Sequence, residues 1–205
     1  MLTYSQMTFR TLRENFGVRV ETVPFLPAIV PRPLPEWLVR YLAINPLTPT
    51  ISKSEKAVSE VLIAPVLSTV KEQYATQIGV FSGESLSTDE LVGICDFIIT
   101  ASATSPLPEP PIIVLVEAKR QNILGGVPQC AAEMLAAQQL NRQEGLHYPA
   151  VYGCVTSGIE WSFLRLQKNT VQADPTVFSH RELERVLGVF DYLLTQFNLS
   201  GPPAR

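Results

Sequence analysis

The pattern of apolar residues predicts a sheet near the middle of the chain. Five consecutive aliphatic residues, 112–116, are followed at once by Glu117 and Lys119. A continuous apolar run of this length is typical of a strand buried on both faces of a sheet. The segment LVGICDFIIT at 91–100 predicts a second strand, and QIGVFSGESL at 77–86 predicts a third with a turn after it. The strand predicted at 112–116 thus ends in a carboxylate and an ammonium that lie two positions apart.

Three longer segments predict helices. In the segment 52–74, apolar residues recur at helical spacing, with Ser52 or Ser54 as the cap and a kink at Pro65. The segment 125–145 is rich in Ala, Met, Leu, Gln and Glu, which favour helix, and Gly-Gly-Val-Pro introduces it.

The third predicted helix covers 179–198 and is amphipathic. Ser179 followed three residues later by Glu182 is the pattern of a capping box at its start. Between the second and third helices, the segments 150–158 and 160–167 predict two strands joined by a turn.

The resulting order from residue 52 is helix, three strands, helix, two strands, helix. A helix connects the strand at 112–116 to the strand at 150–158, which favours a parallel pair with a right-handed crossover. The earlier strands follow one another closely, so we expect antiparallel pairing between them. The sequence therefore predicts an α/β fold, with a mixed β-sheet flanked by helices on both faces.

The first 51 residues follow a different pattern. The segment VPFLPAIVPRPLP at 23–35 contains too many prolines for a continuous helix or a central strand. Short helices are predicted on either side of it, at 5–17 with Ser5 as cap and Gly17 as stop, and at 35–45. We expect residues 1–51 to be an N-terminal extension that packs on a main domain formed by residues 52–205.

Composition narrows the class of protein. The 205 residues are 46% hydrophobic and 17% charged, which is typical of a globular protein with an ample core. Lys and Arg number 16 against 19 Asp and Glu, a net charge of −3, so binding to nucleic acid through bulk positive charge is disfavoured, although a local basic cleft is not.

The chain has neither an apolar run of the ~20 residues that span a membrane nor a secretory signal at its start, so we expect a cytoplasmic protein. Its three cysteines lack metal-binding spacing and predict reduced, buried thiols.

Three ionisable residues are candidates for chemistry. Residues two apart in a strand point to the same face, so Glu117 and Lys119 project together. If the strand that contains Asp96 is the neighbour, two carboxylates and an ammonium meet at one place. Two adjacent carboxylates need a compensating cation, and Mg²⁺ or Mn²⁺ with oxygen ligands is suited to this position. The carbonyl of Ala118 is an available third ligand, and Lys119 would position a metal-bound water.

The pattern of Asp96 followed by Glu117-Ala118-Lys119 resembles the signature of the PD-(D/E)xK nuclease superfamily, which has the restriction-endonuclease-like fold. The resemblance extends over about residues 52–167, because the order of helices and strands is also similar. In one respect the sequence departs from the family: Ile94-Cys95 stands where a proline usually precedes the aspartate. The resemblance implies a three-layer core in which Asp96 and Glu117 hold the metal and Lys119 orients the water.

The resemblance also implies further site residues. A glutamine in the helix after the motif often assists in such enzymes, and Gln129 matches it. Glu133 lies one turn later on the same helix face, where a solvated residue is expected. A glutamate in the first helix often completes the site, and Glu55 and Glu60 compete for that role. Glu55 is preferred, because it lies three residues before the buried Val58, whereas Glu60 in a regular helix is turned away.

Two functions remain open from the sequence. The first is a metal-dependent nuclease that hydrolyses phosphodiester bonds in DNA, with RNA not distinguished, and a homodimer would provide two sites for a double-strand cut. The second is a non-enzymatic nucleic-acid-binding or assembly protein that retains a nuclease-like fold. Neither function involves a membrane.

Overall fold

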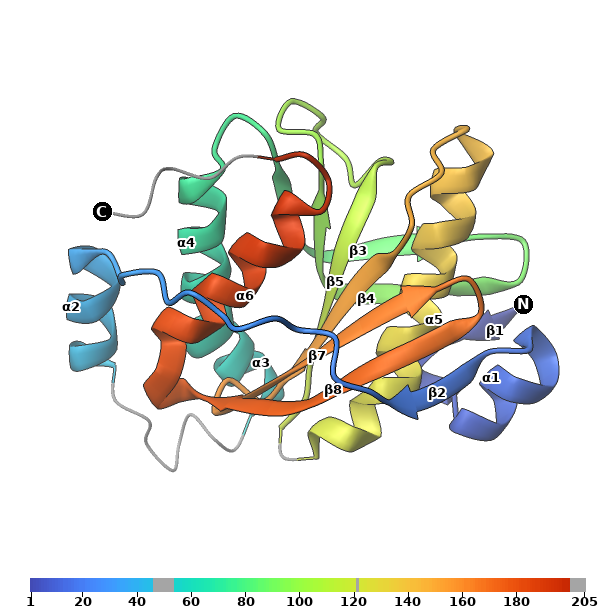
Figure 1. The fold of residues 1–205 in the computed structure, drawn as a ribbon, viewed down its shortest axis with the longest axis horizontal. Helices are drawn as coiled ribbons and strands as arrows, with labels where there is room; N and C mark the ends of the chain where they lie inside the picture. Colours follow the sequence, from blue (N-terminus) through green and yellow to red (C-terminus); the bar gives the residue numbers. More distant parts are fainter. Residues whose placement is uncertain (46–53, 121, 200–205) are drawn as a thin grey trace.

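The structure, a computed structural model, describes residues 1–45, 54–120 and 122–199. Within these ranges, eight strands form one mixed sheet in the order β1-β4-β5-β6-β7-β8-β2, and β3 pairs with β4 outside this path (Figure 1). The strands are β1 Leu2–Thr3, β2 Arg19–Thr22, β3 Gly79–Ser87, β4 Leu91–Thr100, β5 Ile112–Ala118, β6 Val151–Thr156, β7 Glu160–Gln167 and β8 Thr170–Ser179.

Helices cover both faces of the sheet. The helices are η1 Tyr4–Gln6, α1 Phe9–Phe16, α2 Glu36–Ile44, α3 Glu55–Val58, the π-helical turn η3 Ser59–Ile63, α4 Ala64–Gln73, α5 Ile123–Gln143, η4 His180–Glu182 and α6 Leu183–Thr195. One apolar core joins α4 and α6 to the sheet, and a second joins α1 and α5 to the opposite face. Figure 1 shows these two layers on either side of the strands. The α/β class, with a mixed sheet between two helical layers, is confirmed.

The strand pairing around the predicted site is also confirmed. β3 and β5 both run antiparallel to β4, whereas β5 and β6 are parallel. The crossover from β5 to β6 passes through α5, because parallel neighbours cannot be joined by a tight turn. All seven residues of β5 are buried, as the unbroken apolar run predicts.

The N-terminal residues contribute directly to the sheet. β1 pairs in parallel with β4, and β2 pairs in parallel with the edge of β8. The segment 23–35 contains neither helix nor strand, as its prolines predict, and it runs from β2 to α2 across α6 (Figure 1). Its first part is fixed by Asp174, whose carboxylate accepts hydrogen bonds from the backbone N–H groups of Phe25 and Leu26 at 2.8 and 2.9 Å.

The helix ends follow the capping signals with one exception. Ser54 caps α3 by accepting a hydrogen bond from the N–H of Ala57 at 3.3 Å, and Ser52 lies outside the described residues. The capping box of Ser179 and Glu182 is present. The prediction of Ser5 as a cap was wrong, because α1 begins later and Thr8 accepts from the N–H of Thr11 instead. Gly17 does end α1, with a left-handed φ of 63°.

Candidate active site

Asp96 and Glu117 lie on neighbouring antiparallel strands. The antiparallel register pairs Phe97 in β4 with Val116 in β5, and Asp96 and Glu117 are the next residues on these two strands. The carboxyl groups of Asp96 and Glu117 lie within hydrogen-bonding range of each other. The Oδ2 atom of Asp96 also accepts a hydrogen bond from the N–H of Ala118 at 2.7 Å, which ties its carboxylate to the end of β5.

Lys119 lies over Glu117, as their spacing predicts. Its Nζ donates a hydrogen bond to Oε1 of Glu117 and a second, at 3.1 Å, to Oε1 of Gln129 in the second turn of α5. The side chain of Glu117 is only 1% exposed and that of Lys119 is 23% exposed. The structure therefore brings Asp96, Glu117, Lys119 and Gln129 together at the end of β5.

Glu133 is the fifth member of this cluster, and its expected solvation was wrong. Its carboxyl group is fully buried, and Oε1 accepts a hydrogen bond from Nε2 of Gln129 at 3.4 Å. The Oε2 atoms of both Glu133 and Glu117 are buried without a donor. The sequence carried a signal for this: Cys130 to Ala137 is apolar on all sides apart from Glu133, and a helix of that kind is buried.

The pKa values of the carboxyl groups follow from their burial and mutual repulsion. Burial, followed by the charge of Asp96, raises the pKa of Glu117 to about 7. Burial and the charge of Glu117 raise the pKa of Glu133 well above its ordinary value. Burial also raises the pKa of Asp96, although the hydrogen bond from Ala118 opposes this. The cluster thus holds more negative charge than it can carry without protons or a cation.

Lys119 carries the compensating positive charge. Burial lowers its pKa, but the hydrogen bond and the charge of Glu117 outweigh burial, so that the pKa lies above its ordinary value. Lys119 is therefore an ammonium at neutral pH. It can orient a water or an anionic group, but it is not suited to act as a base.

A cavity of about 300 Å³ opens beside Asp96 and Ala118. Glu55, in the first turn of α3, also lines it. The negative charge of Glu55 contributes to the raised pKa values of Asp96 and Lys119, so it lies within electrostatic range of both. Glu117 and Lys119 are not among the residues that line this cavity.

Glu60 lines the same cavity, which the sequence did not predict. In a regular α-helix, residues five apart are about 140° apart around the axis, so Glu55 and Glu60 would face different directions. The π-helical turn η3 inserts one extra residue, and its i→i+5 hydrogen bond runs from the N–H of Ala64 to the carbonyl of Ser59. Glu60 lines the cavity together with Lys56, with which it pairs across one helical turn at 3.8 Å.

The donor atoms of the cluster fit a small divalent cation. Two carboxylates at one place, one of them with a buried oxygen that lacks a donor, and a nearby backbone carbonyl are oxygen ligands of the kind that Mg²⁺ takes. Within residues 1–45, 54–120 and 122–199 there is no group of three or more His, Cys, Asp and Glu side chains suited to a metal ion. Any ion at this site would therefore depend on Asp96, Glu117 and the carbonyl of Ala118, with water completing its shell.

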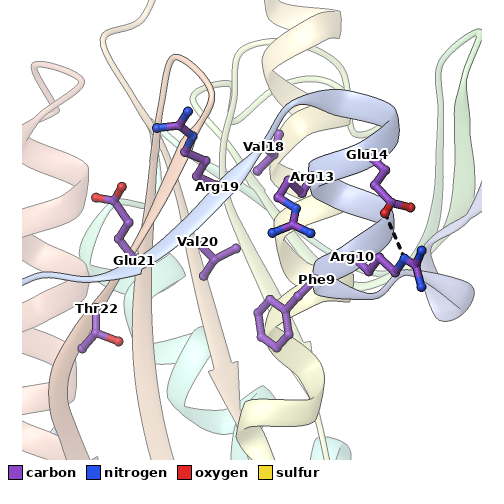
Figure 2. Close-up of a pocket in the computed structure, with 9 residues that line it drawn as sticks. All are labelled: Phe9, Arg10, Arg13, Glu14, Val18, Arg19, Val20, Glu21 and Thr22. Atoms are coloured by element: carbon purple, nitrogen blue, oxygen red, sulfur yellow. Dashed lines mark hydrogen bonds and ion pairs between the residues drawn. The ribbon is translucent and has the colours of Figure 1, made fainter.

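A larger hollow, of about 1050 Å³, lies between α1 and β2 (Figure 2). In Figure 2, Phe9, Arg13 and Val20 point toward its centre, whereas Arg10 is turned toward Glu14, with which it forms an ion pair at 2.9 Å. None of the predicted site residues lines this hollow. The larger cavity is therefore not the one beside the predicted site residues. Asp96 and Glu55 line the smaller cavity instead.

Comparison with solved structures gives similarity of low strength. The solved structure of the type IIG restriction endonuclease BpuSI matches with a TM-score of 0.42 and 18% sequence identity, over 71% of this chain and 17% of that enzyme's chain. The chain thus spans less than a fifth of that enzyme's length. No family model and no curated protein matches the sequence. No helix in the described parts of the chain is both long and apolar enough to cross a membrane.

Proposed function

We propose that the protein is a metal-dependent nuclease of the PD-(D/E)xK type, which hydrolyses phosphodiester bonds in DNA. The observation that carries the proposal is the convergence of Asp96 and Glu117 from neighbouring strands, with the ammonium of Lys119 bonded to Glu117. Buried, mutually repelling carboxyl groups destabilise the fold, and such groups beside a cavity are typical of functional sites. Because the sequence motif and this geometry agree, the site supports the nuclease better than a structural role.

Each residue has a distinct role in the proposed reaction. Asp96, Glu117 and the carbonyl of Ala118 would hold Mg²⁺ or Mn²⁺, which supplies a bound water of lowered pKa and polarises the phosphate. Lys119 would orient the attacking water and offset charge that develops on the phosphoryl oxygens. Gln129 keeps the ammonium of Lys119 in place from the other side. Glu55, which lines the cavity, would add negative charge near the ion.

The proposal is tested by cleavage of supercoiled and linear DNA in Mg²⁺ and Mn²⁺, with a single-stranded RNA as a parallel substrate. Lys119→Ala is expected to lower the cleavage rate at least about 100-fold, because it removes a charge that acts in the transition state. Arg40→Ala, which removes an exposed cation from α2, is the matched control and should retain the wild-type rate. Equal cleavage rates for wild type and Lys119→Ala, or no cleavage with any divalent metal, would refute the proposed nuclease activity.

The alternative is a nucleic-acid-binding or assembly protein that retains the nuclease-like fold. It is favoured by the net charge of −3 and by the contact of Lys119 with Glu117, which already neutralises one carboxylate. On this alternative, DNA binds without cleavage, and divalent metal does not bind to the cluster. Calorimetric titration of the protein with Mn²⁺ separates the two functions, because only the nuclease requires the metal.

A further inference from the structure

The side-chain amide of Gln129 lies between a hydrogen-bond donor, the ammonium of Lys119, and an acceptor, the carboxyl group of Glu133. Its Oε1 accepts from the ammonium of Lys119 at 3.1 Å, and its Nε2 donates to Oε1 of Glu133 at 3.4 Å. An ammonium has donors only, so the oxygen end of the amide must face Lys119. A carboxylate oxygen without a proton accepts only, so the nitrogen end must face Glu133. Glu133 thereby selects one of the two orientations of the amide.

Packing alone does not account for a carboxyl group at position 133. Glu133 is fully buried in α5, between the apolar neighbours Ala132 and Met134. A buried carboxyl group without full pairing destabilises the fold, whereas an aliphatic side chain of similar size would not. The group also lies beside Glu117, and the two carboxyl groups are within hydrogen-bonding range of each other. Glu133 is not among the residues that line the cavity.

We propose that Glu133 is a positioning residue, which fixes the amide of Gln129 so that its oxygen holds the ammonium of Lys119 beside Glu117. Glu133 does not line the cavity. It acts on Lys119 through the side-chain amide of Gln129. The effect on cleavage rests on the proposed nuclease function, whereas the effect on the amide of Gln129 does not.

The orientation of the amide is measured by nuclear magnetic resonance on ¹⁵N-labelled protein. The two Nε2 protons of Gln129 are assigned from the signal that is lost in Gln129→Leu. In wild type, they are expected to be well separated and to exchange slowly with water. Glu133→Leu, which keeps the buried volume, should collapse this separation, and Glu133→Gln should retain it, because its amide oxygen still accepts from Gln129.

Gln138→Leu is the matched control. Gln138 is a buried polar residue of the same helix, outside the cluster, and its substitution also introduces leucine. It should leave the Gln129 protons as in wild type. If Glu133→Leu also leaves these protons unchanged, the positioning role is wrong.

Cleavage provides the second readout. Glu133→Leu should reduce the rate by about 10-fold to 100-fold, the effect of misplacing a catalytic group by about an ångström, and Glu133→Gln should restore most of it. The double variant Gln129→Leu/Glu133→Leu should be no slower than Gln129→Leu, because Glu133 acts through Gln129. If the rate losses of the two single variants add up in the double variant, Glu133 does not act through Gln129. If wild type cleaves nothing, the nuclease proposal fails, and the resonance experiment still decides the role of Glu133.

Discussion

Glu117 has the most unusual surroundings of the residues at the site. It is 1% exposed and has the carboxyl groups of Asp96 and Glu133 as neighbours, and it accepts a hydrogen bond from the ammonium of Lys119. The spacing of Asp96, Glu117 and Lys119 could be read from the sequence, because strand periodicity and adjacency place them together. The burial of Glu133 was not predicted: helix periodicity relates it to Gln129, whereas the signal for its burial is the apolar composition of residues 130–137 on all sides of the helix.

The raised pKa of Glu117 predicts how stability changes with pH. Its pKa is about 7 in the folded protein against an ordinary value of 4.5, so the folded state keeps a proton that the unfolded state releases. Its contribution to stability is therefore complete below pH ~4.5 and is lost as pH rises through ~7, by up to about 3 kcal/mol. Urea unfolding of metal-free protein between pH 5 and pH 8 measures this fall.

Glu117→Gln should flatten the dependence, because an amide does not titrate. Glu144→Gln, in an exposed residue beyond α5, is the control and should keep the wild-type slope. A slope that is the same in Glu117→Gln and wild type would show that Glu117 does not carry the raised pKa.

At the level of elements, the strands and long helices could be predicted, and the irregular ones could not. β4, β5 and α5 follow from apolar runs and helix-forming composition. β8 was missed because Asp174-Pro175 interrupts it, and proline within an apolar segment argues against a strand. The π-helical turn η3 has no sequence signature that periodicity detects.

The junction of β5 and α5 depends on a glycine. The helix predicted over 125–145 begins two residues earlier, so that 123–126 forms the first turn of α5, capped by Asn122. A Cβ on Gly126 would lie 2.7 Å from Cγ1 of Val155 and 2.9 Å from Cγ of Lys119. Glycine is therefore required for the helix to pack against the aliphatic part of Lys119.

Gly126→Ala is expected to displace Lys119 and to lower both stability and cleavage. Overpacking of this kind costs about 1–3 kcal/mol, and urea unfolding measures it. The adjacent Gly125→Ala is the control: its Cβ would lie 3.3 Å or more from the side chain of Asn122, and glycine at an exposed helical position is less favourable than alanine by up to about 1 kcal/mol. Gly125→Ala should therefore preserve activity with equal or higher stability. Equal behaviour of the two variants would contradict the packing argument.

On the scale of the whole molecule, the site is assembled from three distant parts of the chain. α3 with η3 brings Glu55 and Glu60, β4 brings Asp96, and β5 with α5 brings Glu117, Lys119 and Gln129. The placement of β1 and β2 in the sheet could not be predicted, because both are short strands whose partners, β4 and β8, lie far away in the sequence. Nonlocal pairing of this kind leaves no periodic pattern in the sequence itself.

The most direct test of the account is whether Asp96 and Glu117 together bind one divalent ion. Calorimetric titration with Mn²⁺ at pH 8, where Glu117 is deprotonated, should show one site in wild type and none in Asp96→Asn, whose amide oxygen still accepts from Ala118 and so preserves the fold. Asp89→Asn, in an exposed acidic residue, should bind Mn²⁺ as wild type does. Absence of binding in wild type, or equal binding in wild type and Asp96→Asn, would contradict the proposed metal site.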